Sequence, residues 1–226
     1  MSLASGASRT FSFLLVDKFG MFSFAAAIDA IRIANRIAGV PYYKWHTVTV
    51  DGGLVRGSNG IELKPDHSIS TLPQSDVLFV CASSLIDPPD KPKILAAIRA
   101  QARRGGGLGS IVLGTILLAE AGQLNGYRCT VHWENRAAFV ERFPDVECTG
   151  NTCAGGTTAI DLMLEIIRGD LGADVAAEVA NQIQHERIRT GSDRQRIGRE
   201  RDLTGRSEKL RKVVELMADH LEEPLT

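Results

Sequence analysis

The strongest constraint on the fold is an alternation of short apolar segments with longer segments that have the apolar spacing of helices. Residues 11–16 and 77–82 are apolar runs, and the second is continuous, as in strands buried on both faces of a parallel sheet. Helical spacing follows each run, at 22–37 and 91–103. This alternation predicts an α/β fold, a doubly wound, mostly parallel sheet with helices on both faces.

The same alternation continues through most of the chain. Further strands are predicted at 45–50, 61–63, 109–112 and 128–131, and further helices at 115–121, 134–142, 157–168, 173–188 and 207–221. Ligands of such sheets bind beyond the carboxyl ends of the strands. We therefore expect the site at the loops that follow Val16, Cys81 and Val112.

Composition excludes several other classes of protein. No run approaches the roughly 18 apolar residues of a membrane span, and the polar start MSLASGASRT lacks the apolar core of a signal peptide. We therefore expect a cytoplasmic protein that does not contact membranes. The cysteines form no CxxC motif and no Cys/His ligand pair, so no metal and no cofactor are expected.

Charge is distributed unevenly along the chain. Residues 187–212 contain 10 basic and 4 acidic residues, although the net charge of the whole chain is −1. A basic segment on an acidic body fits either an interaction segment near nucleic acid or a solvated helix surface and linker.

The transition from strand to helix at 109–115 is the most informative local feature. Elbows of this kind expose a nucleophile, usually serine or cysteine, in α/β hydrolase-like proteins. Here the apex is Val112, which has no nucleophilic atom, and Ser110 lies two residues earlier on the strand. We therefore expect Ser110 to be structural and the chain not to be an enzyme.

Residues 108–126, LGSIVLGTILLAEAGQLNG, resemble the elbow of the ThiJ/PfpI branch of the class I glutamine amidotransferase-like superfamily, which has a flavodoxin-like fold. In that branch the apex is typically a cysteine followed by Thr-Gly, whereas this chain has Val112 and Leu113. The motifs TVHWEN (130–135), TCAGG (152–156), IDL (160–162) and ERIR (186–189), with DRQR (193–196), resemble AraC-family transcriptional regulators with such an N-terminal domain. The nearest subgroup senses quaternary amines and amino acids, such as glycine betaine, carnitine and arginine.

This resemblance implies a domain organisation. Residues 1–9 are expected to form a disordered tail, 10–190 the ligand-sensing domain, 191–206 a basic linker, and 207–226 the start of a truncated AraC-type helix-turn-helix domain. DNA is then contacted only through a helix-turn-helix domain, and this chain lacks the recognition helix of that domain. The connection from Val146 to Thr152 is shorter than in relatives, which leaves two alternatives: a natural shortening or missing residues.

The resemblance also implies a ligand site at the elbow. The expected ligand-binding residues are Asp29, Val112, Leu113, His132, Trp133, Glu134 and Asn135. We expect Val112 to keep the strained backbone of the family's apex and to form the apolar floor of a pocket walled by Asp29, His132 and Trp133.

Each of these residues also has a structural interpretation. Asp29 fits a contact with a cationic ligand or a cap on a backbone group, and His132 a ligand contact or a buried structural histidine. Trp133 fits the core or a cation–π contact with a quaternary ammonium. Glu134 and Asn135 suit the first turn of a helix. Structural roles are expected for Cys81 and Cys153, and packing or a dimer surface for Tyr42, Tyr43 and Trp45.

Three functions compete. The leading interpretation is a ligand-sensing, dimerising domain of an AraC-family regulator, a homodimer that responds to a small-molecule effector. The alternative is a ThiJ/PfpI-type hydrolase or glyoxalase-like enzyme, against which the valine at the apex argues. A third is a structural dimerisation module without a small ligand.

Overall fold

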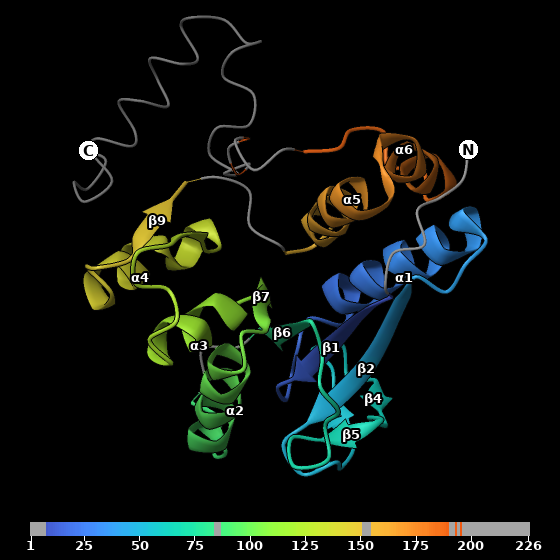
Figure 1. Ribbon diagram of the computed structural model, residues 1–226. Coiled ribbons are helices and arrows are strands. Elements are labelled where there is room, and N and C mark those ends of the chain that lie inside the picture. Colours follow the sequence, from blue (N-terminus) through green and yellow to red (C-terminus); the bar gives the residue numbers. More distant parts are fainter. Residues whose placement is uncertain (1–7, 84–86, 151–154, 190–192, 194, 196–226) are drawn as a thin grey trace, which may run out of the picture. The chain divides into compact units, whose positions relative to one another are not determined.

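The computed structural model describes residues 8–83, 87–150, 155–189, 193 and 195 (Figure 1). Its strands are β1 (Arg9–Leu15), β2 (Tyr43–Thr49), β3 (Val55–Arg56), β4 (Glu62–Leu63), β5 (His67–Ser68), β6 (Val77–Ala82), β7 (Gly107–Val112), β8 (Arg128–Thr130) and β9 (Glu147–Thr149). Its helices are α1 (Met21–Ala38), α2 (Lys91–Arg103), α3 (Gly114–Glu120), the 3₁₀ turn η1 (Trp133–Asn135), α4 (Arg136–Arg142), α5 (Thr158–Leu171) and α6 (Ala173–Gln182).

The central sheet has the strand order β5-β2-β1-β6-β7, and all of its pairings are parallel. From β1 the chain moves outward to β2, and from β6 it moves outward to β7 in the opposite direction. The order therefore reverses between β1 and β6, which is where doubly wound sheets bind ligands. The predicted doubly wound, flavodoxin-like fold is confirmed.

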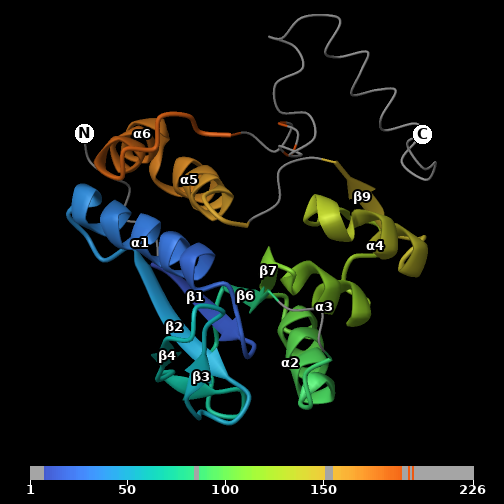
Figure 2. The same ribbon diagram turned by 180° about the vertical axis from the view of Figure 1, so that it is seen from behind.

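Alternating side chains of the strands fill two separate cores. Phe11, Phe13 and Leu15 belong to the core that α1, α5 and α6 cover, whereas Leu14 and Val16 belong to the core under α2 and α3. This period of two explains why the strands read as continuous apolar runs, since both faces are buried. Figure 2 shows the same two groups of helices from behind.

One of two small two-stranded sheets follows α3; the other is the antiparallel pair β3 and β4. β8 and β9 pair in parallel, and Val131, Phe139 and Val146 form a core beside them with Ala119 of α3. The apolar pattern did not predict β9, because a strand of three residues with one partner carries little periodicity.

α6 ends at Gln182, six residues before the predicted end at 188. The amide of Gln184 donates to the carbonyl of Asn181 at 3.1 Å, and the amide of His185 donates to that of Ala180 at 2.9 Å. With Gln184 at φ +54°, this is a Schellman motif. Glycine usually holds this left-handed position, so Gln184 carries no local signal that the helix ends here.

The chain divides into two compact units, residues 1–194 and 195–226. The expected helix at 207–221, most of the basic linker and Cys153 lie outside the described residues. The domain boundaries therefore stay a prediction. In the described ranges, no helix is long and apolar enough to cross a bilayer.

Candidate functional site at the carboxyl edge of the sheet

The elbow between β7 and α3 has the strained backbone that the sequence predicted. Val112 has φ +58°, in the left-handed region that β-branched residues rarely adopt. The amide of Leu113 donates to the carbonyl of Ala82 at 2.8 Å, which ties the elbow to the end of β6. The apex conformation is therefore retained although its side chain has no nucleophilic atom.

A glycine makes this elbow possible. At Gly114, the first residue of α3, a Cβ atom would lie 1.9 Å from the carbonyl oxygen of Val80. No side chain fits there, because the neighbour is the backbone of a central strand. Helix α3 can therefore begin directly against β6.

The side chain of Val112 faces the start of α1. A Cβ atom at Gly20 would lie 3.2 Å from Cγ2 of Val112 and 3.7 Å from the hydroxyl oxygen of Ser23. Ser23 is buried, and its Oγ accepts a hydrogen bond of 2.7 Å from the amide of Gly156. The apex valine thus lies at a packed junction between α1 and the turn before α5.

A cavity of about 310 Å³ opens beside the elbow, next to the point where the strand order reverses. Its apolar side includes the ends of β1 and β6 and the first turn of α3, and its polar side carries charged residues of both signs. The lining residues are Val16, Asp17, Lys18, Ala82, Asp87, Pro88, Pro89, Lys91, Leu113, Ile116, Leu117, Glu120 and Arg142.

Ion pairs organise the charged side of the cavity. The side chain of Glu120 is 7% exposed and pairs with Arg142 and with Lys91, whose Nζ lies 3.0 Å from Oε2. Lys91 also pairs with Asp87 at 2.8 Å. Hydrogen bonds to Asp87 and Glu120 raise the pKa of Lys91, so its ammonium group stays charged. Three elements, α2, α3 and α4, therefore meet around one carboxylate.

A second strained residue lies at the cavity. Lys18, in the loop after β1, has φ +60°, and its carbonyl accepts a hydrogen bond from the hydroxyl of Ser83. Two of the three non-glycine residues with positive φ in the described ranges, Lys18 and Val112, thus lie at the carboxyl edge of the sheet. Backbone strain gathers at functional sites, which favours this edge as the site.

The structure does not bring Asp29 to the elbow. Its side chain is 58% exposed and forms a 2.6 Å ion pair with Arg32 one turn later on α1. Asp29 also lies nine residues after Gly20, roughly 13 Å along a helix axis. The expectation that it walls a pocket with Val112 is therefore corrected: the acidic residue and its partner lie on an exposed surface of α1.

The other predicted residues form two groups. Leu113 lines the cavity, next to Val112 at the apex. The η1 turn, which carries Trp133, Glu134 and Asn135, follows His132. His132 Nδ1 lies 3.4 Å from Oε2 of Glu134, and the rings of His132 and Trp133 have centroids 5.5 Å apart.

One contact links this turn to the elbow. The hydroxyl of Thr115 in α3 donates to the carbonyl of Thr130, two residues before His132, at 3.2 Å. That hydroxyl also shares a 2.7 Å hydrogen bond with Ser110, which gives Ser110 the structural role expected of it. Cys81 is fully buried, and burial raises the pKa of its thiol, as expected for a structural cysteine.

Sequence reasoning missed the charged residues of the cavity and Ser23. Lys91, Glu120 and Arg142 are far apart in the chain and each suits an exposed helix position, so no local pattern indicated that they meet. Within the described part of the chain, no group of three or more His, Cys, Asp or Glu residues is placed to hold a metal ion.

The sequence pattern that defines the DJ-1/PfpI family matches residues 12–169, and the chain belongs to this family. The HTH-type transcriptional regulator GbdR of Pseudomonas aeruginosa is 36% identical over 96% of this chain and 62% of the regulator. The HTH-type transcriptional regulator CdhR of the same species is 37% identical over 97% of this chain and 68% of the regulator. The chain therefore spans less than two thirds of the length of GbdR.

A solved structure agrees with these relatives. The crystal structure of an AraC family transcriptional regulator from Pseudomonas putida has a TM-score of 0.69 and 29% identity, covering 77% of this chain and 99% of that one. The resemblance to AraC-family regulators with a ThiJ/PfpI-type domain is thereby confirmed.

Proposed function

We propose that this chain is the effector-sensing and dimerising part of an AraC-family transcriptional regulator of the cytoplasm. The effector is a small amine or amino-acid-like metabolite, and DNA is contacted through a helix-turn-helix domain. The observation that carries the proposal is the elbow: Val112 keeps the strained apex conformation without a nucleophile, beside a cavity at the reversal of the strand order.

The proposal places the effector in the cavity. Leu113, Ile116 and Leu117 supply apolar contact area, and Lys91, Glu120 and Arg142 supply charges of both signs within reach of one ligand. A metabolite that carries both charges and an apolar body matches this lining. Similarity to regulators over nearly the whole chain supports sensing rather than catalysis.

A thermal-shift screen of the purified chain with betaine, carnitine, choline and arginine tests the proposal. A ligand that binds only the folded state raises the melting temperature, by an amount that grows with its concentration. Lys91→Met, which removes one charge from the cavity, should abolish most of the shift. Lys93→Met is the matched control, since Lys93 is an exposed lysine of the same helix turn that pairs with Asp90.

Two results count against the proposal. One is the absence of a shift with any amine or amino acid at millimolar concentration. The other is a shift that Lys91→Met and Lys93→Met reduce equally. Catalysis is tested separately: hydrolase or glyoxalase turnover that is lost on substitution of Ser110 or Cys153 would establish the enzyme alternative instead.

A further inference from the structure

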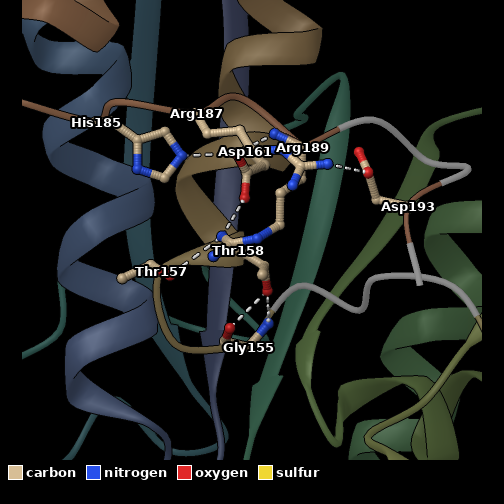
Figure 3. Close-up of polar contacts among 8 residues, drawn as sticks. All are labelled: Gly155, Thr157, Thr158, Asp161, His185, Arg187, Arg189 and Asp193. Carbon is tan, nitrogen blue, oxygen red and sulfur yellow. Dashed lines mark hydrogen bonds and ion pairs between the residues drawn. The ribbon is translucent and has the colours of Figure 1, made fainter. Parts of the chain in front are cut away.

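Asp161 is a buried carboxylate that the proposed effector site does not use. It lies in the first turn of α5, and its side chain is 4% exposed (Figure 3). A buried charge is costly unless it is paired and hydrogen-bonded. The partners of the Asp161 carboxylate therefore indicate which part of the chain it positions.

The side chain of Asp161 accepts hydrogen bonds from one short segment, residues 185–189. Oδ1 accepts from the amide of Arg189 at 2.8 Å and lies 2.7 Å from Nε2 of His185. Oδ2 accepts from Nη1 of Arg189 at 3.0 Å. An ionised carboxylate only accepts hydrogen bonds, so Nε2 of His185 is the donor.

Apart from these bonds, the segment has few attachments. The left-handed residue Gln184 turns the chain out of α6, and 184 and 186–188 are exposed. Residues 185–189 belong to no helix or strand in the described part of the chain. Its position therefore depends largely on one carboxylate, and the basic stretch 187–212 begins within it.

The turn before α5 is hydrogen-bonded to the start of α1, which lies beside the elbow. The amide of Gly156 donates to Oγ of Ser23 at 2.7 Å, and a Cβ atom added at Gly20 would lie within 4 Å of both this oxygen and Val112. Arg189 Nη1 also donates to the hydroxyl of Thr157 at 3.3 Å. Val112 and Ser23 thus both lie beside Gly20, and hydrogen bonds lead from Ser23 through the turn at 155–157 to the segment that Asp161 holds.

We propose that Asp161 is a clasp that positions segment 185–189, the path out of the sensing domain, and that the Ser23–Gly156 hydrogen bond couples this clasp to the elbow. The hydrogen bonds of Asp161 support the clasp whether or not the chain senses an effector. The role of the clasp in signalling rests on the proposed sensing function, because an effector beside the elbow would act on the basic stretch through these contacts.

Hydrogen exchange followed by mass spectrometry on the 226-residue chain tests the clasp without any effector. Asp161→Asn keeps the shape of the side chain and removes its charge. We expect the hydrogen-bonded amides of this segment, those of His185 and Arg189, to exchange at least about tenfold faster, because opening of the segment then costs less free energy. Glu165→Gln, on the exposed side of the same helix where it pairs with Arg168, should leave them unchanged.

Two variants of the held segment provide the same test if Asp161→Asn does not fold. His185→Gln and Arg189→Ala alter only the held segment and should produce the same acceleration. Unchanged exchange of 185–189 in all three variants would overturn the clasp.

A further variant tests the coupling between the clasp and the elbow. Ser23→Ala removes the acceptor of the Gly156 amide and should also accelerate exchange at 185–189. Ser12→Ala is its control, since this buried hydroxyl has no hydrogen-bond partner among the described residues. If Ser23→Ala leaves the segment as protected as in the parent, the coupling is wrong. Failure of the thermal-shift screen would overturn the sensing function and leave these exchange results untouched.

Discussion

Val112 has the left-handed backbone of the elbow's apex although its side chain has no nucleophilic atom. Left-handed backbone costs an L-residue about 1–2 kcal/mol, and a β-branched side chain restricts it further. The bond from Leu113 to Ala82 and the contact between Gly114 and β6 hold the conformation in place. The surrounding elements therefore decide the backbone at this position.

Val112→Cys should be tolerated. Cysteine is smaller and unbranched, so relief of strain offsets the loss of a methyl group, and we expect the free energy of unfolding to stay within about 1 kcal/mol of the parent. Val80→Cys, at a fully buried strand position without positive φ, should lower it by about 1 kcal/mol or more. Urea denaturation measures both, and equal losses in the two variants would contradict the strain argument.

The carboxylate of Asp66 makes the stability of the folded protein depend on pH. Burial alone would raise the pKa of Asp66, but hydrogen bonds from the amide and hydroxyl of Thr47, at 2.8 and 2.7 Å, together with nearby His46 and His67, lower it. A lowered folded-state pKa stabilises the protein above the unfolded value of about 4, and this stabilisation is lost as pH falls through the folded-state pKa.

Asp66→Asn should therefore be less stable than the parent at neutral pH and should show a smaller further loss below about pH 4. Asp29→Asn is the control, because an exposed ion pair such as Asp29–Arg32 contributes little. Urea denaturation at a series of pH values measures these differences. Parallel pH curves for the parent and Asp66→Asn would show that this carboxylate has no part in acid stability.

At the scale of elements, two glycines in helices have opposite roles. Gly114 lets α3 begin against β6, whereas a Cβ atom at Gly169 in α5 would meet nothing within 4 Å. The first glycine is required by packing between elements, and the second is only a weak helix former.

Gly114→Ala should destabilise the domain by about 3 kcal/mol or more, because the backbone of α3 or of β6 has to move. Gly169→Ala should be neutral or stabilising by up to about 1 kcal/mol. Thermal or urea unfolding distinguishes them. A Gly114→Ala protein as stable as the parent would mean that the start of α3 is not fixed by this contact.

At the scale of the whole molecule, exposed apolar side chains indicate an interaction surface. Phe22 at the start of α1 and Leu54 and Ile61 beside the β3–β4 hairpin are each more than half exposed. Backbone hydrogen bonds from Lys18 to Arg56 and from Ser58 to Phe19 join the loop before α1 to the β3–β4 hairpin. The proposed regulator would bind paired half-sites on DNA, which call for a two-fold symmetric protein, so we expect this surface to be a dimer interface.

Light scattering at high micromolar concentration should give the mass of a dimer, and Phe22→Glu should shift it toward the monomer by placing a charge in an apolar interface. Tyr127→Glu, at another exposed aromatic residue, should leave the mass unchanged. A monomeric parent, or dissociation by both variants alike, would exclude this surface.

The sequence by itself determined the layers of the fold and the position of the elbow. The strand runs of β1 and β6, the amphipathic patterns of α1 and α2, and the absence of a nucleophile at Val112 are local properties, and local patterns report burial and backbone geometry reliably. The motifs around residues 108–135 also indicated the family.

Only the tertiary structure decided which distant side chains share a site. Asp29 and Val112 were expected to share one pocket, yet about half the length of α1 separates them. Lys91, Glu120 and Arg142 meet although nothing in their own segments distinguishes them from exposed residues. The bonds of Asp161 to residues 185–189 were hidden for the same reason. A hydrogen bond between residues far apart in the chain depends on how whole elements pack, and the spacing of apolar residues carries no record of that.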